Sequence, residues 1–163
     1  MVAQYLAMEH PKLVEKLVLG VTLSRQNETM RNAVETWIQF AKNNDMESFI
    51  EDMLLKMYSN EYIRKYRMLI PLMIKMSKKA DLKRFIILAK VCLTCDIYEK
   101  LHRIQCPTLV LGGKQDKVVT GEASEEIAEK LKCEIYMYEE LGHAAYEEAK
   151  DFNMRIYNFL RKS

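Results

Sequence analysis

Glycine is unevenly distributed along this chain of 163 residues, and its distribution limits the fold more than any other feature. Only five glycines occur, and none falls between Gly20 and Gly112. A long stretch without glycine is typical of helices joined by short polar turns. The remaining glycines lie beside short apolar runs of the kind that form strands. We therefore expect a strand-bearing part interrupted by a helical insert.

Three short segments outside the glycine-free stretch carry strand patterns. Residues 16–22 and 108–111 are continuous apolar runs, as in strands of a parallel sheet that are covered on both faces. Residues 133–139 alternate apolar and polar side chains, as a strand near a sheet edge does. Helices are predicted around these runs, over residues 1–9, 122–132 and 149–161. This order of elements predicts an α/β fold with a parallel sheet.

The helix predicted over residues 1–9 is apolar on most of its circumference, so we expect it to be buried on most sides. No N-cap Ser, Thr, Asp or Asn precedes it, and Pro11 ends it. These features predict that a segment N-terminal to Met1 belongs to the same domain. Without that segment, the helix would expose an apolar face and the following strand an unpaired edge. We therefore expect the chain to associate with itself or with the missing N-terminal half.

Residues 26–100 show the hydrophobic period of amphipathic helices. Asn27, Asp45 and Asp81 are suitable N-caps for helices that begin directly after them. A further helix starts at Asn60, and Pro71 is expected to kink or split it.

The helical insert holds seven of the 11 methionines of the chain. Methionine adapts to varied shapes, so these side chains suit a pliable apolar ceiling over a substrate pocket. Ordinary helical core is the alternative, and the sequence leaves both open. Trp37, Met53 and Met57 are the candidates for substrate contacts.

Charge and hydropathy exclude several classes of protein. The net charge of +2 argues against a nucleic-acid partner, which requires a basic excess. No apolar run approaches the roughly 18 residues of a membrane span, and no signal peptide opens the chain. We therefore predict a cytoplasmic location and no membrane partner.

The four cysteines, Cys92, Cys95, Cys106 and Cys133, fit a reducing compartment. Cys92 and Cys95 have C-x-x-C spacing, which is also found in redox and zinc sites. A zinc site needs a second ligand pair at similar spacing, and the chain offers none beside them. Helical core is the favoured interpretation, and no metal is expected.

Two polar residues follow predicted strands. Asp116 lies just after the strand at 108–111, and His143 lies just after the strand at 133–139. Ligands of open parallel sheets gather beyond the carboxyl ends of the strands. An aspartate that accepts a hydrogen bond from histidine Nδ1 orients the ring for proton transfer near neutral pH. Gly142 is expected to let the backbone turn sharply beside the histidine.

At these residues the chain resembles the α/β-hydrolase superfamily of the lid-bearing type. Residues 1–19 look like the helix and strand that follow the nucleophile elbow of that family. Residues 107–116 look like its acid-bearing strand and loop, and Gly142-His143 with Glu148 looks like its histidine loop. The resemblance implies the C-terminal part of an α/β-hydrolase sheet with an inserted all-helical lid. It divides the chain into a core segment 1–25, a lid 26–100, and a core segment 101–163 that carries acid and histidine.

The chain departs from the family pattern in one important respect, because no G-x-S-x-G motif occurs. By resemblance, the elbow and its nucleophile belong directly before Met1. Some relatives place the acid after the earlier strand, but residues 21–25 contain no carboxylate, so Asp116 is preferred. Thr120 stands where the family often has proline.

The resemblance implies a hydrolase, similar to carboxylic-ester hydrolases, that acts on a small-molecule ester or related acyl substrate. His143 would transfer the proton, Asp116 would orient His143, and no metal or organic cofactor would be needed. Two alternatives stay open. In the first, this chain is by itself an inactive fragment or an interaction module. In the second, the same fold catalyses another reaction, such as C–C bond hydrolysis, dehalogenation or acyl transfer.

Overall fold

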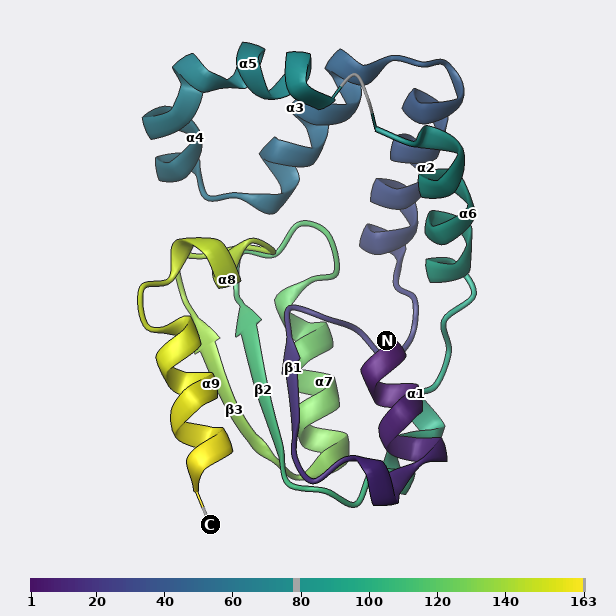
Figure 1. The fold of residues 1–163 in the computed structure, drawn as a ribbon, viewed down its shortest axis with the longest axis vertical. Helices are drawn as coiled ribbons and strands as arrows, with labels where there is room; N and C mark the ends of the chain where they lie inside the picture. The colour runs from purple at the N-terminus through teal and green to yellow at the C-terminus, as the bar shows by residue number, and fades with distance from the viewer. Residues whose placement is uncertain (78–79, 163) are drawn as a thin grey trace.

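The computed structural model of the chain describes residues 1–77 and 80–162. Its described strands form a parallel sheet in the order β1-β2-β3 (Figure 1). The strands are β1 (Leu17–Gly20), β2 (Thr108–Gly113) and β3 (Glu134–Tyr138). All residues of the central strand β2 are buried, whereas β3 alternates exposed and half-buried residues up to its last residue, Tyr138, which is buried. The predicted parallel sheet and its edge strand are therefore confirmed.

Helices cover both faces of this sheet. Val110 of β2 packs in one core cluster with residues of α1 (Val2–Glu9) and α7 (Gly121–Leu131). Leu109 and Leu111 face the other side, where they pack with α9 (Phe152–Arg161). Because successive side chains of a strand point to opposite faces, the unbroken apolar run of β2 serves both layers. The α/β class expected from the sequence is confirmed.

The helical segment between β1 and β2 lies beyond the carboxyl ends of the strands, at the top of Figure 1. Its helices are α2 (Glu28–Lys42), α3 (Met46–Met57), α4 (Asn60–Tyr66), α5 (Ile70–Ser77) and α6 (Leu82–Cys92). The predicted N-caps Asn27, Asp45 and Asp81 each accept a hydrogen bond from the backbone N–H three residues on. These side chains therefore fix where α2, α3 and α6 begin. Residues 78 and 79, inside the predicted insert, lie outside the described residues.

The split expected at Pro71 lies slightly earlier than the proline itself. The helix that begins at Asn60 ends at Tyr66, and a 3-10 turn leads into α5. Pro71 is the second residue of α5, where a missing backbone N–H removes no helical hydrogen bond. Proline therefore helps to start α5, and the chain bends before it.

The prediction that helix 1–9 is buried on most sides is wrong for this chain. Only Gln4, Ala7 and Met8 of α1 are buried, while Val2 is 84% exposed. The helix packs against β1 and the 3-10 helix Tyr98–Arg103, which cover one side of it. An exposed apolar face on α1, the other expectation from its sequence, is present. None of the helices in the described ranges has the length and apolar composition needed to cross a membrane.

Candidate active site

Asp116 lies in the loop that leaves the carboxyl end of β2. Its side chain is 1% exposed. The carboxylate Oδ1 accepts hydrogen bonds from the backbone N–H groups of Val118 at 2.7 Å and Val119 at 2.9 Å. Two donors on one oxygen fix the orientation of the carboxylate and leave its second oxygen available for another partner.

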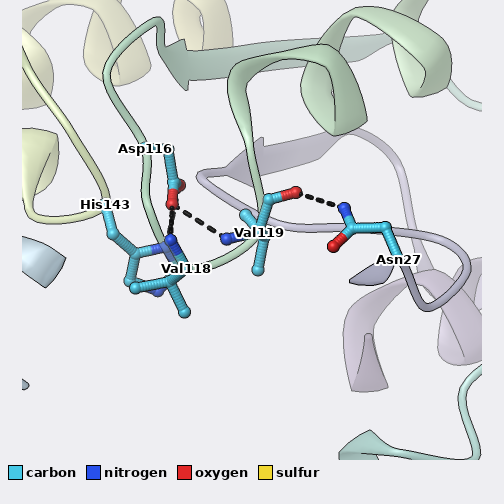
Figure 2. A network of polar contacts seen from close by, with 5 residues as sticks. All are labelled: Asn27, Asp116, Val118, Val119 and His143. Carbon is cyan, nitrogen blue, oxygen red and sulfur yellow. Dashed lines mark hydrogen bonds and ion pairs between the residues drawn. The ribbon is translucent and has the colours of Figure 1, made fainter. Parts of the chain in front are cut away.

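That partner is His143, which follows β3. Its Nδ1 lies 2.9 Å from Asp116 Oδ2, although the two residues are 27 positions apart in the chain (Figure 2). Because an ionised carboxylate can only accept, Nδ1–H is the donor and Nε2 is left as a proton acceptor. The His143 side chain is 21% exposed. The structure thus brings together the two candidate residues in the geometry of an oriented general base.

Close backbone contact between the two loops produces this geometry. A Cβ atom on Gly113 would lie 2.3 Å from the carbonyl oxygen of Gly142, and one on Gly142 would lie 3.1 Å from that of Gln115. The Gln115 N–H also donates to the Leu141 carbonyl at 2.9 Å. The sharp turn expected at Gly142 is not the reason for its glycine, because no described glycine has a positive φ. Close approach is what requires glycine at Gly113, and at Gly142 it makes any larger residue crowded.

Two β-branched residues beside the site adopt strained backbone conformations. Val21, directly after β1, has φ 41°, and Thr120, after the acid loop, has φ 70° and ψ 151°. Such conformations cost about 1–3 kcal/mol each and persist only where the surroundings enforce them. Proline, fixed near φ −65°, cannot adopt the Thr120 conformation.

An apolar cavity of about 280 Å³ lies beside His143. Its wall combines Trp37 from α2 with the strand-end residue Val21 and the acid-loop residues Val118 and Val119. The Trp37 indole N–H donates to Asp52 Oδ2 at 2.8 Å, which holds the ring in place. Of the three residues predicted to contact substrate, Trp37 is therefore next to His143.

Met53 and Met57 lie elsewhere. Both are on α3, half-buried against the hydrophobic core, and neither is among the described residues that line the cavity. Met57 does contact the histidine loop, but through its backbone, since its carbonyl accepts from the Ala144 N–H at 2.8 Å. Neither methionine therefore shares with Trp37 the cavity beside His143.

Further polar contacts tie the corner between α3 and α4 to the short helix α8 (Ala145–Glu148), which the sequence did not predict. Ser59 donates to Glu148 from its backbone N–H at 3.0 Å and also from its hydroxyl. The Tyr58 hydroxyl donates to Glu147 Oε2 at 2.7 Å. Burial, followed by this bond to Glu147, raises the pKa of Tyr58. Nothing in the local sequence pattern indicates these contacts, because they join residues 89 positions apart.

Residues 1–77 and 80–162 contain no group of three or more His, Cys, Asp or Glu side chains arranged to hold a metal ion. Cys92, the last residue of α6, and Cys95, in the turn after it, are free thiols, and burial raises the pKa of both. The site described above thus consists of an acid, a histidine and an apolar cavity.

Solved structures with this fold include α/β hydrolases. An alpha/beta hydrolase enzyme from a Medee basin deep-sea metagenome library matches with a TM-score of 0.86 and 20% identity, over 99% of this chain and 62% of that one. The enol-lactonase of Burkholderia xenovorans matches with a TM-score of 0.84 and 17% identity, over 98% and 61%. At these identities the likeness concerns the fold. The chain is therefore a partial α/β-hydrolase fold, as the resemblance implied.

The sequence comparisons identify the family. The chain is 25% identical over 162 residues to pyrrolizixenacetamide deacetylase of Xenorhabdus hominickii, over 95% of this chain and 59% of that protein. The family model described as "Serine aminopeptidase, S33" matches residues 1–150, so the chain belongs to that hydrolase family. It spans between 59% and 62% of the length of these three relatives.

Proposed function

We propose that the protein is a hydrolase of a small-molecule ester or related acyl compound, with His143 as its general base. The observation that carries the proposal is the 2.9 Å contact between His143 Nδ1 and the buried Asp116 carboxylate, with an apolar cavity beside the ring. In this role His143 Nε2 takes the proton of the nucleophile and returns it to the leaving group. Asp116 keeps the proton on Nδ1 and stabilises the imidazolium that forms.

The nucleophile is proposed to come from a segment outside these 163 residues, and to be a serine. The chain has no G-x-S-x-G elbow, while the relatives it matches are longer. The same segment would supply the oxyanion-hole N–H groups, since one of them follows the nucleophile in this fold. The acyl-enzyme would then be hydrolysed by a water that His143 activates. By itself the chain is proposed to be inactive, because it lacks one member of the triad.

The helical segment 26–100 is proposed to act as a lid over core segments 1–25 and 101–163. Its helices lie beyond the carboxyl ends of the strands, where Asp116 and His143 meet (Figure 1). Trp37 is proposed to contact the acyl group, because it lines the cavity beside His143. Met53 and Met57 are proposed to contact only those parts of the substrate that extend beyond this cavity.

The cavity favours an uncharged acyl group. Its wall holds no Asp, Glu, Lys or Arg among the described residues. A cationic substrate group would lose its hydration there without gaining a carboxylate partner, and it would lie beside His143 and the amino-terminal residue Met1. An aliphatic ester or acetyl-type amide suits this wall better than the charged amino terminus of a peptide.

The test is hydrolysis of an activated ester by a longer form of the protein that includes the upstream segment. We expect turnover that falls by roughly 10⁴- to 10⁶-fold in His143→Ala, since loss of a triad member removes about this much. Turnover that survives His143→Ala would overturn the proposal. Met154→Ala on the exposed side of α9 is a control that should leave turnover unchanged.

A further inference from the structure

Asn27 makes two hydrogen bonds with different partners. Its Oδ1 accepts from the Met30 backbone N–H at 2.8 Å, which caps α2. Its Nδ2 donates to the Val119 carbonyl at 2.7 Å, across 92 positions of the chain. The first bond is the N-cap expected from the sequence. The second bond is not needed for capping, and it joins the start of the helical segment to the acid loop.

The loop segment that Asn27 holds is the one that orients Asp116. The Val119 N–H donates to Asp116 Oδ1, and the carbonyl of the same residue receives the Asn27 bond (Figure 2). Asp116 Oδ2 in turn contacts His143. An uninterrupted path of hydrogen bonds and one residue of backbone therefore connects Asn27 with the histidine.

The conformation of Thr120 gives a second reason why this loop needs support. The Asn27 bond fixes the carbonyl of the peptide group that joins Val119 to Thr120, and Thr120 has φ 70° and ψ 151°. This region of backbone conformation is essentially reserved for glycine, so a β-branched residue stays there only under constraint. Asp116 restrains the N–H side of Val119, and Asn27 restrains its carbonyl side.

We propose that Asn27 is a positioning residue for the Asp116–His143 pair, in addition to its role as helix cap. The inference rests on the proposed function, since it assigns Asn27 to the same site. Asn27 does not touch the reacting atoms. It holds Val119 in place, so that both N–H donors of the acid loop stay aimed at Asp116 and the carboxylate stays aimed at His143.

Substitutions separate the two roles of Asn27. Serine and aspartate cap helices about as well as asparagine, so Asn27→Ser and Asn27→Asp keep α2. Neither reproduces the amide donor: serine is too short to reach Val119, and aspartate carries only acceptors. Asp45→Ser is the matched control, because it exchanges one good cap for another at α3, where the side chain bonds to the Ser48 N–H.

The readout is the proton NMR resonance of His143 Nδ1–H in the 163-residue chain, which a bond to a carboxylate moves far downfield. We expect the resonance to move upfield or to broaden away in both Asn27 variants, and to stay in place in Asp45→Ser. A folded Asn27→Ser with an unchanged resonance would overturn the proposal. So would an Asn27→Ser that fails to fold while Asp45→Ser folds, because Asn27 would then be structural.

A kinetic arm uses the longer, active form. We expect Asn27→Ser to lower kcat for an activated ester by up to about 100-fold with little change in KM, because the pair is misplaced while the cavity is intact. An unchanged kcat would contradict the proposal. The NMR arm needs no turnover, so it decides the role of Asn27 even if the proposed hydrolysis fails. Absence of the downfield resonance in the unsubstituted chain would overturn both the role of Asn27 and the Asp116–His143 contact on which the proposed function rests.

Discussion

The two oxygens of Asp116 have separate tasks. Oδ1 satisfies the backbone N–H groups of Val118 and Val119, and Oδ2 contacts His143. The first task concerns the stability of the loop, and the second concerns which ring nitrogen of His143 carries the proton. Because the side chain is 1% exposed, water does not easily take its place as hydrogen-bond acceptor when the side chain is removed.

Substitutions at Asp116 should separate these tasks. Asp116→Asn retains an oxygen for the loop, so we expect near-native stability together with a loss of kcat of about 10⁴-fold in the active form, because the wrong histidine tautomer is favoured. Asp116→Ala also strands two buried N–H donors, which should lower the free energy of unfolding by a further 1–3 kcal/mol, roughly. Urea unfolding and activated-ester kinetics measure the two effects. Equal stability of the two variants would contradict this division.

At the scale of elements, the sequence predicted what depends on local pattern. The apolar run of β2, the N-caps Asn27 and Asp45, and the order of strands and helices were all visible. Asp116 and His143 were also identified, because each directly follows a strand. The sequence did not predict three other features: the positive φ at Thr120, the cavity beside Trp37, and the bond from Asn27 to the acid loop. These features depend on contacts between segments far apart in the chain, which periodicity and capping rules do not describe.

The contact between Glu148 and Ser59 joins α8 to the start of α4. Glu148→Ala removes two charge-assisted hydrogen bonds, each worth roughly 1.5–3 kcal/mol. We expect faster hydrogen exchange at the Ser59 amide and at the first amides of α4, while exchange in β2 stays unchanged. Glu147→Ala is the control, because it removes only the exposed bond to Tyr58. Equal exchange in both variants would argue against a coupling role for Glu148.

Tyr138 at the end of β3 should give the protein an alkaline stability limit. Burial, followed by its hydrogen bond to Asp151, raises the pKa of Tyr138 from 10.0 to about 12. A raised folded-state pKa means that the stabilisation is complete below pH 10 and is lost as the pH rises toward 12. We expect the free energy of unfolding to fall across this window, and to fall less steeply in Tyr138→Phe. Identical slopes in urea unfolding would contradict this assignment.

At the scale of the whole molecule, one side of the chain has the properties of an interface. Val2, Tyr5 and Leu6 of α1 are exposed apolar residues. Apolar side chains gathered on the exposed side of one helix are typical of an interaction surface, so this side of α1 is the candidate interface.

We therefore predict that the 163-residue chain associates with itself, or with the segment that is proposed to supply the nucleophile. Light scattering at increasing concentration should show a rising average mass, because the apolar face of α1 is removed from water on association. Leu6→Asp should reduce this rise, whereas Leu160→Asp on the exposed face of α9 should have less effect. A monodisperse monomer at all concentrations would contradict the prediction.

We propose that this chain contributes His143 and Asp116 to a catalytic triad whose nucleophile it does not contain. The most direct test mixes the purified chain with the separately produced polypeptide encoded immediately upstream, and measures hydrolysis of an activated ester. We expect no turnover by either part alone, turnover by the mixture, and loss of that turnover when the chain carries His143→Ala. Turnover by the mixture that is unaffected by His143→Ala, or turnover by the chain alone, would contradict it.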